Sequence, residues 1–173
     1  VQVVAFRSLS RATRALIVHY TCHPTTTADN YVSSEFPGLA MQQLEDTEKL
    51  EVAMYLQGCC GDIRPSLTRH DTFYRGGDEE VCALGAELSQ QVLSVLRGNL
   101  QPCRPGFYRA NKTHVPLDFA ILPTETELRG YQCRPGIEGE WSRGLLEHPE
   151  RLYPRVLELS RLDLGEDLSL IAM

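Results

Sequence analysis

The chain has 173 residues and a net charge of −6, from 23 acidic and 17 basic residues spread along the sequence rather than gathered into blocks, which argues against a nucleic-acid partner. With a hydrophobic content of 42%, enough to bury one core, the sequence predicts a single domain over residues 1–173. The 173 residues contain no apolar run of the roughly 18 to 20 residues that a membrane span needs and no secretory signal, so no transmembrane segment is expected.

Two buried strands are predicted at the start of the chain, over residues 1–6 and 15–22. Both runs are short and rich in apolar and β-branched residues, and the polar residues 7–14 between them are typical of a turn. Proline and small polar side chains follow from residue 23 to residue 30. The pattern therefore predicts a loop directly after the second strand.

The next elements alternate between helices and strands. Residues 38–50 have a loosely helical apolar pattern, residues 52–57 are typical of a third strand, and a tight glycine-bearing turn follows over residues 58–65. The clearest amphipathic helix covers residues 78–97. This alternation predicts an α/β fold with a mixed β-sheet covered by helices, in which a functional site lies at strand ends.

The remainder of the chain has a weaker pattern. Residues 106–117 alternate as a strand does, with Pro116 near its end. Charged residues with scattered prolines and glycines favour a helical insertion over residues 124–161, with helical segments at 139–148 and 149–161. A turn leading into a last strand is predicted for residues 164–173.

The six cysteines follow no Cys-x-x-Cys spacing, so a zinc knuckle built from thiolates is not expected. Cys22, Cys59 and Cys60 lie in runs of apolar or small residues, where a free cysteine behaves as a small buried hydrophobic residue. Reduced thiols and a cytoplasmic location are therefore favoured. A secreted protein with a few disulfides is the alternative.

His23 is the side chain that most suggests chemistry, because it follows a strand and precedes a proline and three threonines. A neutral imidazole held rigidly at a strand end can bind a metal ion or a substrate. The alternative is that its ring only hydrogen-bonds a neighbouring loop. His19, two residues earlier on the same face of the strand, is either a neighbour that supports His23 or a core histidine.

Two segments resemble a known family. HYTCHPTTTADNYVSSEFPG (residues 19–38) and YLQGCCGDIRPSL (residues 55–67) resemble, in order and spacing, two sequence blocks of the neutral/alkaline non-lysosomal ceramidase-like hydrolases. The first has the form His-Pro-Thr followed by Asn, and the second the form Gly-x-x-Gly-Asp-x-x-Pro. The resemblance covers about residues 1–100. The rest of the chain resembles the family only weakly, in the order of its predicted helices and strands.

The resemblance implies a zinc-dependent hydrolase that cleaves an amide (N-acyl) or related bond in a small-molecule or lipid-like substrate, and it implies that His23 is a zinc ligand. The family's other ligands have no counterpart in this sequence, so the chain is expected to be an incomplete catalytic domain, inactive by itself, that needs flanking segments of the same protein. The alternative is a catalytically silent ligand-binding or scaffold domain of the same fold.

Arg64 stands where the resemblance places a nucleophilic serine. Because an arginine cannot act as a nucleophilic hydroxyl, metal-activated water is the expected nucleophile, with Ser66 as a weaker alternative. Arg64 can instead bind a carboxylate or phosphate through its paired donors. Asp62 is a candidate catalytic base or partner of a catalytic group, although an aspartate in a tight turn often accepts backbone N–H bonds.

Asn30 and Glu35 are the candidate substrate-binding residues. Asn30 lies in the loop that follows His23 and can also order that loop. Glu35 stands where the resembling family has an aspartate, and it can orient a ligand or pair with a cation.

Overall fold

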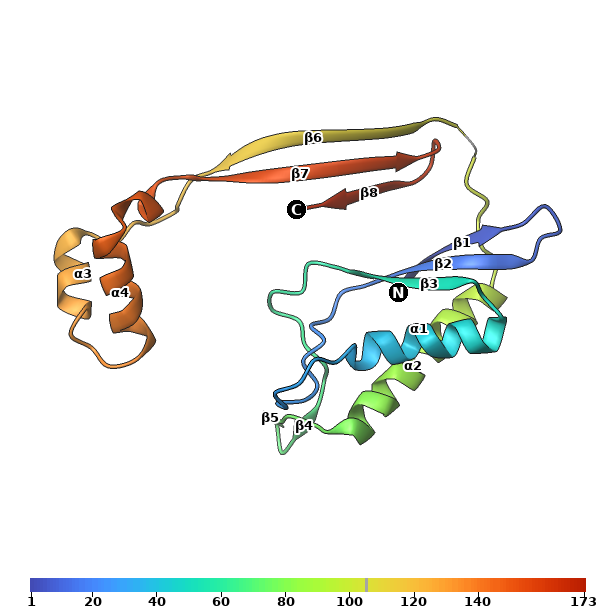
Figure 1. Ribbon diagram of the computed structural model, residues 1–173, viewed down its shortest axis with the longest axis horizontal. Helices are drawn as coiled ribbons and strands as arrows, with labels where there is room; N and C mark the ends of the chain where they lie inside the picture. The colour runs from blue at the N-terminus through green and yellow to red at the C-terminus, as the bar shows by residue number, and fades with distance from the viewer. Residues whose placement is uncertain (105) are drawn as a thin grey trace. The chain divides into compact units, whose positions relative to one another are not determined.

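The computed structural model describes residues 1–104 and 106–173, and the chain divides into two compact units, Val1–Gln101 and Pro102–Met173. Each unit has its own sheet and its own pair of α-helices (Figure 1). That both units belong to one catalytic domain remains a prediction. Among the described residues, no helix is both long enough and apolar enough to span a bilayer.

The first unit is built on a mixed three-stranded sheet. Its strands are β1 (Gln2–Arg7), β2 (Thr13–Tyr20) and β3 (Val52–Gln57), in the order β1-β2-β3. β1 pairs with β2 antiparallel, whereas β2 pairs with β3 parallel. The structure therefore confirms the mixed sheet and the three strands that the sequence predicts in this unit.

Two helices, α1 (Glu35–Glu48) and α2 (Asp78–Arg97), lie against one face of this sheet (Figure 1). The predicted bounds of α2 are confirmed, and α1 begins three residues before its predicted start. Gly85 allows the helices to lie close together, since a Cβ there would be 3.0 Å from the Cβ of Leu39. The buried apolar core between helices and sheet consists of Leu16, Val18, Cys22, Phe36, Ala40, Met41, Leu44, Ala53, Leu88 and Val92.

The other face of the first sheet is exposed within its unit. Alternation along β3 buries Ala53 and leaves Val52 and Met54 45% and 50% exposed, and Phe6 of β1 is 44% exposed. The helices of this unit therefore cover one face of the sheet only.

The parallel pairing of β2 and β3 determines where their following segments lie. Tyr20 is opposite Gln57 at the last pair of the ladder, so both strands end at the same edge of the sheet. The turn after β3 leads to a short hairpin, β4 (Thr68–Arg69) and β5 (Thr72–Phe73), which the sequence pattern did not predict.

The second unit has a long antiparallel sheet, β6 (Tyr108–Leu117), β7 (Arg155–Leu164) and β8 (Ser169–Ala172), in the order β6-β7-β8. Helices α3 (Glu125–Tyr131) and α4 (Ile137–Glu147) and the short 3₁₀ helix η1 (Pro149–Leu152) lie in the connection between β6 and β7. The helical insertion expected over residues 124–161 is thus confirmed in its first part, and the predicted final strand is confirmed as β8.

The helical prediction for residues 149–161 is wrong beyond Leu152, because β7 begins at Arg155. This strand pairs with β6 through ten consecutive residue pairs, from Tyr108 opposite Leu164 to Leu117 opposite Arg155. The long-range backbone pairing overrides a local pattern that is compatible with a helix.

Few side chains are buried in the second unit. Leu128 and Leu145 are buried between α3 and α4, whereas all ten residues of β6 are exposed. Polar contacts support the sheet: Lys112 pairs with Glu158 across β6 and β7 at 2.6 Å. Backbone pairing between the strands, more than a buried core, therefore holds this unit together.

Candidate functional site

The two sequence segments that carry the family resemblance meet at the edge where β2 and β3 end. The His23 backbone N–H donates to the Ile63 carbonyl at 2.8 Å, and the Gly58 N–H donates to the Tyr20 carbonyl at 3.1 Å. The Gln57 side-chain amide donates to the Cys22 carbonyl at 3.0 Å. We call residues 21–27 and 58–66 the carboxyl-edge site. The ends of parallel strands are a common position for ligand sites in α/β proteins.

Gly58 makes this close approach possible. A Cβ at position 58 would lie 2.0 Å from the Thr21 hydroxyl oxygen and 3.0 Å from Nε2 of His19, which is far too close for a real atom pair. Gly61, three residues later in the same turn, has open space where its Cβ would be. Of these two glycines, Gly58 is therefore the one that the packing of the two segments requires.

His23 has a fixed backbone and a free ring. Its side chain is exposed, and the described part of the chain provides no hydrogen-bond partner for its ring nitrogens. Such a ring is accessible to a ligand from outside the loop.

Glu35 lies directly beneath the loop that follows His23. It is the first residue of α1 and only 9% exposed. Its Oε1 accepts hydrogen bonds from the backbone N–H groups of Thr26 at 2.9 Å and Thr27 at 3.1 Å. The carboxylate thus points to the loop backbone, and a direct contact of Glu35 with substrate remains a prediction.

Asp62 and Asn30 are both exposed, and the structure places them differently. Asp62 lies in the turn after β3, within the carboxyl-edge site, and its carboxylate accepts no hydrogen bond from the residues that the structure describes. It is therefore available to a ligand. Asn30 lies in the loop between β2 and α1, outside that site.

Arg64 is half-buried, and its guanidinium carbon lies 4.9 Å from the centroid of the Phe73 ring, a cation–π contact. Its Nε is buried without a hydrogen-bond partner in the described residues. Arg64 and Ser66 line a pocket of about 250 Å³ that reaches α2 at Glu87 and Gln91. Glu87 and Gln91 were not among the site residues predicted from the sequence. Each of them directly precedes a core residue of α2, Leu88 or Val92. This spacing could have placed Glu87 and Gln91 at the border of the helix's buried face.

Thiol and phenol groups surround the buried end of β2. Burial, and secondarily the proximity of Cys60, raise the pKa of the Cys22 thiol, and burial also raises the pKa values of Tyr20 and Tyr55. The Tyr55 hydroxyl donates to the Tyr20 carbonyl at 3.1 Å. Because the thiolate is the reactive form of cysteine, a raised pKa makes Cys22 a poor nucleophile at neutral pH.

The described residues do not form a complete zinc site. No group of three or more His, Cys, Asp or Glu side chains with metal-binding geometry is found among them, whereas a catalytic zinc ion takes about three protein ligands. The nearby His19 has its Nδ1 2.9 Å from the Gln2 side-chain oxygen. The described residues alone therefore do not supply the three ligands of a catalytic zinc site, and the role of His23 as a zinc ligand remains a prediction.

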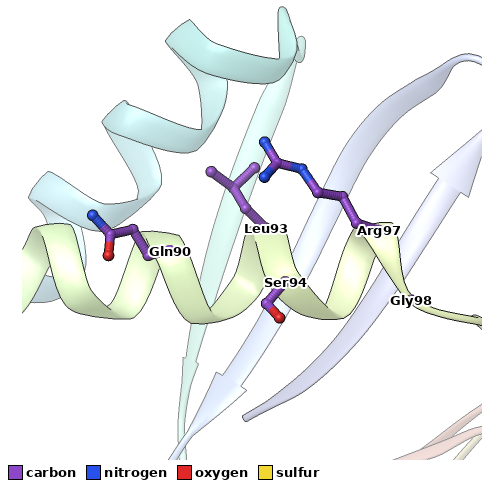
Figure 2. A pocket seen from close by; sticks show the side chains of 5 residues that line it. All are labelled: Gln90, Leu93, Ser94, Arg97 and Gly98. Atoms are coloured by element: carbon purple, nitrogen blue, oxygen red, sulfur yellow. The ribbon is translucent and has the colours of Figure 1, made fainter.

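Another pocket, of about 470 Å³, lies along the end of α2 (Figure 2). Its lining residues, Gln90, Leu93, Ser94, Arg97 and Gly98, all come from α2 and the residue that follows it. This lining contains no histidine, cysteine or carboxylate side chain. The pocket is a surface depression on one helix and offers no catalytic group.

The mixed sheet with helices on one face, the parallel strands that end at a shared edge and the long hairpin of the second unit define a partial domain of a ceramidase-like fold. No protein-family model matches the chain, and no curated protein matches it. Among solved structures, the chain is similar to neutral ceramidase from Pseudomonas aeruginosa, with a TM-score of 0.59 and 15% sequence identity. The similarity covers 98% of this chain and 33% of that chain, so the chain spans about a third of the ceramidase's length. At this identity the similarity shows the fold alone.

Proposed function

We propose that this chain is part of a zinc-dependent hydrolase of the neutral ceramidase-like type that cleaves an amide (N-acyl) or related bond in a small-molecule or lipid-like substrate. The observation that carries the proposal is the joining of the His23 loop and the Asp62 turn at the edge where β2 and β3 end. In this proposal His23 supplies one zinc ligand, and polypeptide outside these 173 residues supplies the others. The similarity of fold to a neutral ceramidase supports this assignment.

Zinc, when bound, would polarise a carbonyl group and make a bound water more acidic. The chain's own residues contribute binding and orientation. His23 presents a free imidazole from a fixed backbone, and the exposed carboxylate of Asp62 can accept a proton or orient a water molecule. The guanidinium of Arg64 can bind a carboxylate or phosphate of the substrate.

The proposal names water as the nucleophile. Arg64 cannot serve as a nucleophilic group, because its guanidinium carries no hydroxyl or thiol. Ser66 lines the pocket beside Arg64 and is the alternative nucleophile. Trapping and sequencing a covalent acyl adduct at Ser66 would contradict the proposal of water.

A second function is a catalytically silent domain that binds a ligand. It is favoured by the absence, among the described residues, of any group of three or more side chains that could hold a metal ion, and by the pocket that Arg64 lines. In this case the pocket would bind its ligand without any metal.

The zinc content of the full-length protein distinguishes the two functions. We expect one zinc ion per chain, lost in His23→Asn and retained in His70→Asn. His70 is a suitable control because it is exposed, and asparagine tolerates its left-handed backbone at φ 52°. Hydrolysis of an N-acyl substrate should disappear together with the zinc. A full-length protein without zinc, or a His23→Asn variant with wild-type zinc content, contradicts the hydrolase proposal.

A further inference from the structure

We infer that Glu35 is a positioning residue, whose buried carboxylate determines the backbone conformation of residues 23–27 and so the direction in which the His23 side chain leaves the backbone. The inference concerns the chain's own loop. It therefore holds or fails in metal-free protein, independently of the proposed hydrolase activity.

The contacts of one carboxylate oxygen carry the inference. Oε1 of Glu35 accepts two backbone N–H groups, from Thr26 at 2.9 Å and from Thr27 at 3.1 Å. Thr26 is 0% exposed and Glu35 is 9% exposed, so water does not readily replace this acceptor. Hydrogen bonds to an ionised acceptor are stronger than those between neutral groups.

The backbone at Glu35 is strained, which is unusual for the first residue of a helix. Its φ of 53° is in the left-handed region, which residues other than glycine rarely adopt. The Ser33 hydroxyl accepts the Glu35 backbone N–H at 2.9 Å and helps to hold this conformation. Strain of this kind persists only where the surrounding structure enforces it, and it is frequent at functional sites.

The other contacts of the loop complement those of Glu35. The Gly76 N–H donates to the Thr26 carbonyl at 2.8 Å, and an Arg75 guanidinium N–H donates to the Thr25 carbonyl at 2.5 Å. These two contacts provide hydrogen-bond donors for the loop's carbonyl groups, whereas Glu35 provides the acceptor for its amide N–H groups. Without its carboxylate, the N–H groups of Thr26 and Thr27 lose their acceptor inside the protein.

Loss of the Glu35 carboxylate should also affect His23, because the His23 ring has no hydrogen bond of its own among the described residues to hold it in place. The direction in which the side chain leaves the backbone is therefore determined by the backbone on both sides: the bond from the His23 N–H to Ile63 on one side and the loop held by Glu35 on the other. A loop that repacks after Thr25 would leave only the first of these constraints.

Glutamine is the conservative replacement at this position. It keeps a carbonyl oxygen that can accept both amides, and its new amide group takes the place of Oε2, which is buried without a partner. We therefore expect Glu35→Gln to retain the loop and Glu35→Ala to lose it.

Glu45 provides a matched control on the same helix. Its Oε1 accepts the Ala53 backbone N–H at 2.8 Å, which is also a hydrogen bond from a backbone amide to a carboxylate. This bond lies at the start of β3, at the opposite edge of the sheet from the loop that carries His23. Glu35→Gly adds a second comparison, since it removes the carboxylate and relieves the left-handed strain together.

The experiment follows His23 and the loop by NMR in the full-length, metal-free protein, with hydrogen exchange of the Thr26 and Thr27 amides and ring signals of labelled histidine. In Glu35→Ala and Glu35→Gly, we expect these amides to exchange at least about tenfold faster, because each loses a bond to a charged acceptor. The His23 ring signals should shift and broaden. Glu35→Gln should stay within about threefold of wild type, and Glu45→Ala should leave both readouts unchanged while lowering Tm.

Two results would overturn the inference. One is wild-type loop exchange and wild-type His23 signals in Glu35→Gly. The other is the same loop change in Glu45→Ala, which would make the effect one of general stability. If Glu35→Ala does not fold, the pair Glu35→Gln and Glu35→Gly decides the question, since the glycine variant carries no left-handed strain. Absence of zinc would contradict the proposed function and leave this inference untouched.

Discussion

The two units of the chain are stabilised in different ways. In Val1–Gln101, ten apolar side chains form one buried cluster between two helices and a sheet. Among the described residues of the second unit, 102–104 and 106–173, Leu128 and Leu145 are the buried apolar side chains, and β6 has no buried residue. Burial of apolar side chains therefore dominates the first unit, whereas backbone pairing between strands dominates the second.

This difference bears on where a precise site can form. The carboxyl-edge site lies on the first unit, on strands whose inner faces are buried against α1 and α2. Groups that bind a ligand or a metal need supports that do not move, and a packed core provides them. The following experiments test whether the two units differ in this way.

The largest effect is expected from the core of the first unit. Leu44 is 0% exposed, so Leu44→Ala should destabilise this unit by about 2 to 5 kcal/mol through lost burial and a residual cavity. Val156→Ala in the second unit, where the side chain is 63% exposed, should change stability by less than about 0.5 kcal/mol. Chemical denaturation, monitored by hydrogen exchange in each unit, measures the stability change in both variants. Equal losses in the two variants would remove the distinction between the units.

A smaller effect is expected where β2 and β3 end. Gly58→Ala places a methyl group against Thr21 and should cost about 1 to 3 kcal/mol, as overpacking typically does. It should also increase exchange at His23, because the bond between the two segments lengthens. Gly61→Ala is the control in the same turn, where the added methyl group meets no atom within 4 Å. Identical effects of the two substitutions would show that the turn, rather than the contact with Thr21, is sensitive.

Acid should affect the second unit selectively. The Arg104 side chain, and secondarily its backbone N–H, hold the pKa of Asp167 at about 2, below its ordinary 3.8. A carboxyl whose pKa is lowered by folding stabilises the folded state above its unfolded pKa, and this contribution is lost as pH falls through the folded pKa. The protection of amides in β8 and in the turn before it, measured relative to the intrinsic exchange rate at each pH, should therefore decrease as the pH falls from about 4 to about 2. Asp167→Asn should reduce this pH dependence, and an unchanged pH profile in that variant would contradict the assignment.

The smallest effect is expected from a surface ion pair. Arg129 and Glu125 are one helical turn apart on α3, with Nη2 and Oε1 2.6 Å apart, and both side chains are mostly exposed. Arg129→Ala should change the stability of the second unit by no more than about 0.5 kcal/mol. Thermal unfolding at low and high salt measures this contribution. A loss above 1 kcal/mol would mean that ion pairs support this unit more strongly than exposed pairs usually do.

The sequence predicted the first unit better than the second for a physical reason. Helix 78–97 and strand 52–57 have strong local periodicity that agrees with their tertiary environment, and their bounds were predicted correctly. β7 was predicted in part as helix, because its strand conformation depends on pairing with β6, some 40 residues earlier in the chain. Such pairing is not encoded in a local window.

The candidate site shows the same limit. The order of the two motifs indicated that His23 and Asp62 follow successive strands, and the parallel pairing places them at one edge. The contact of Glu35 with the amides of Thr26 and Thr27 could not be predicted, because it depends on the left-handed backbone at position 35. A glutamate gives no sequence signal for that conformation.

The exposed strand β6 has a consequence for self-association. It lies at the edge of its sheet, and an edge strand offers a template on which a second chain can add a strand and so begin a fibril. Lys112 and Pro116 interrupt this template, since a lysine charge and a proline without an N–H both oppose strand addition. Replacing both with valine should leave the β6–β7 pairing in place and convert a protected edge into one that nucleates aggregation.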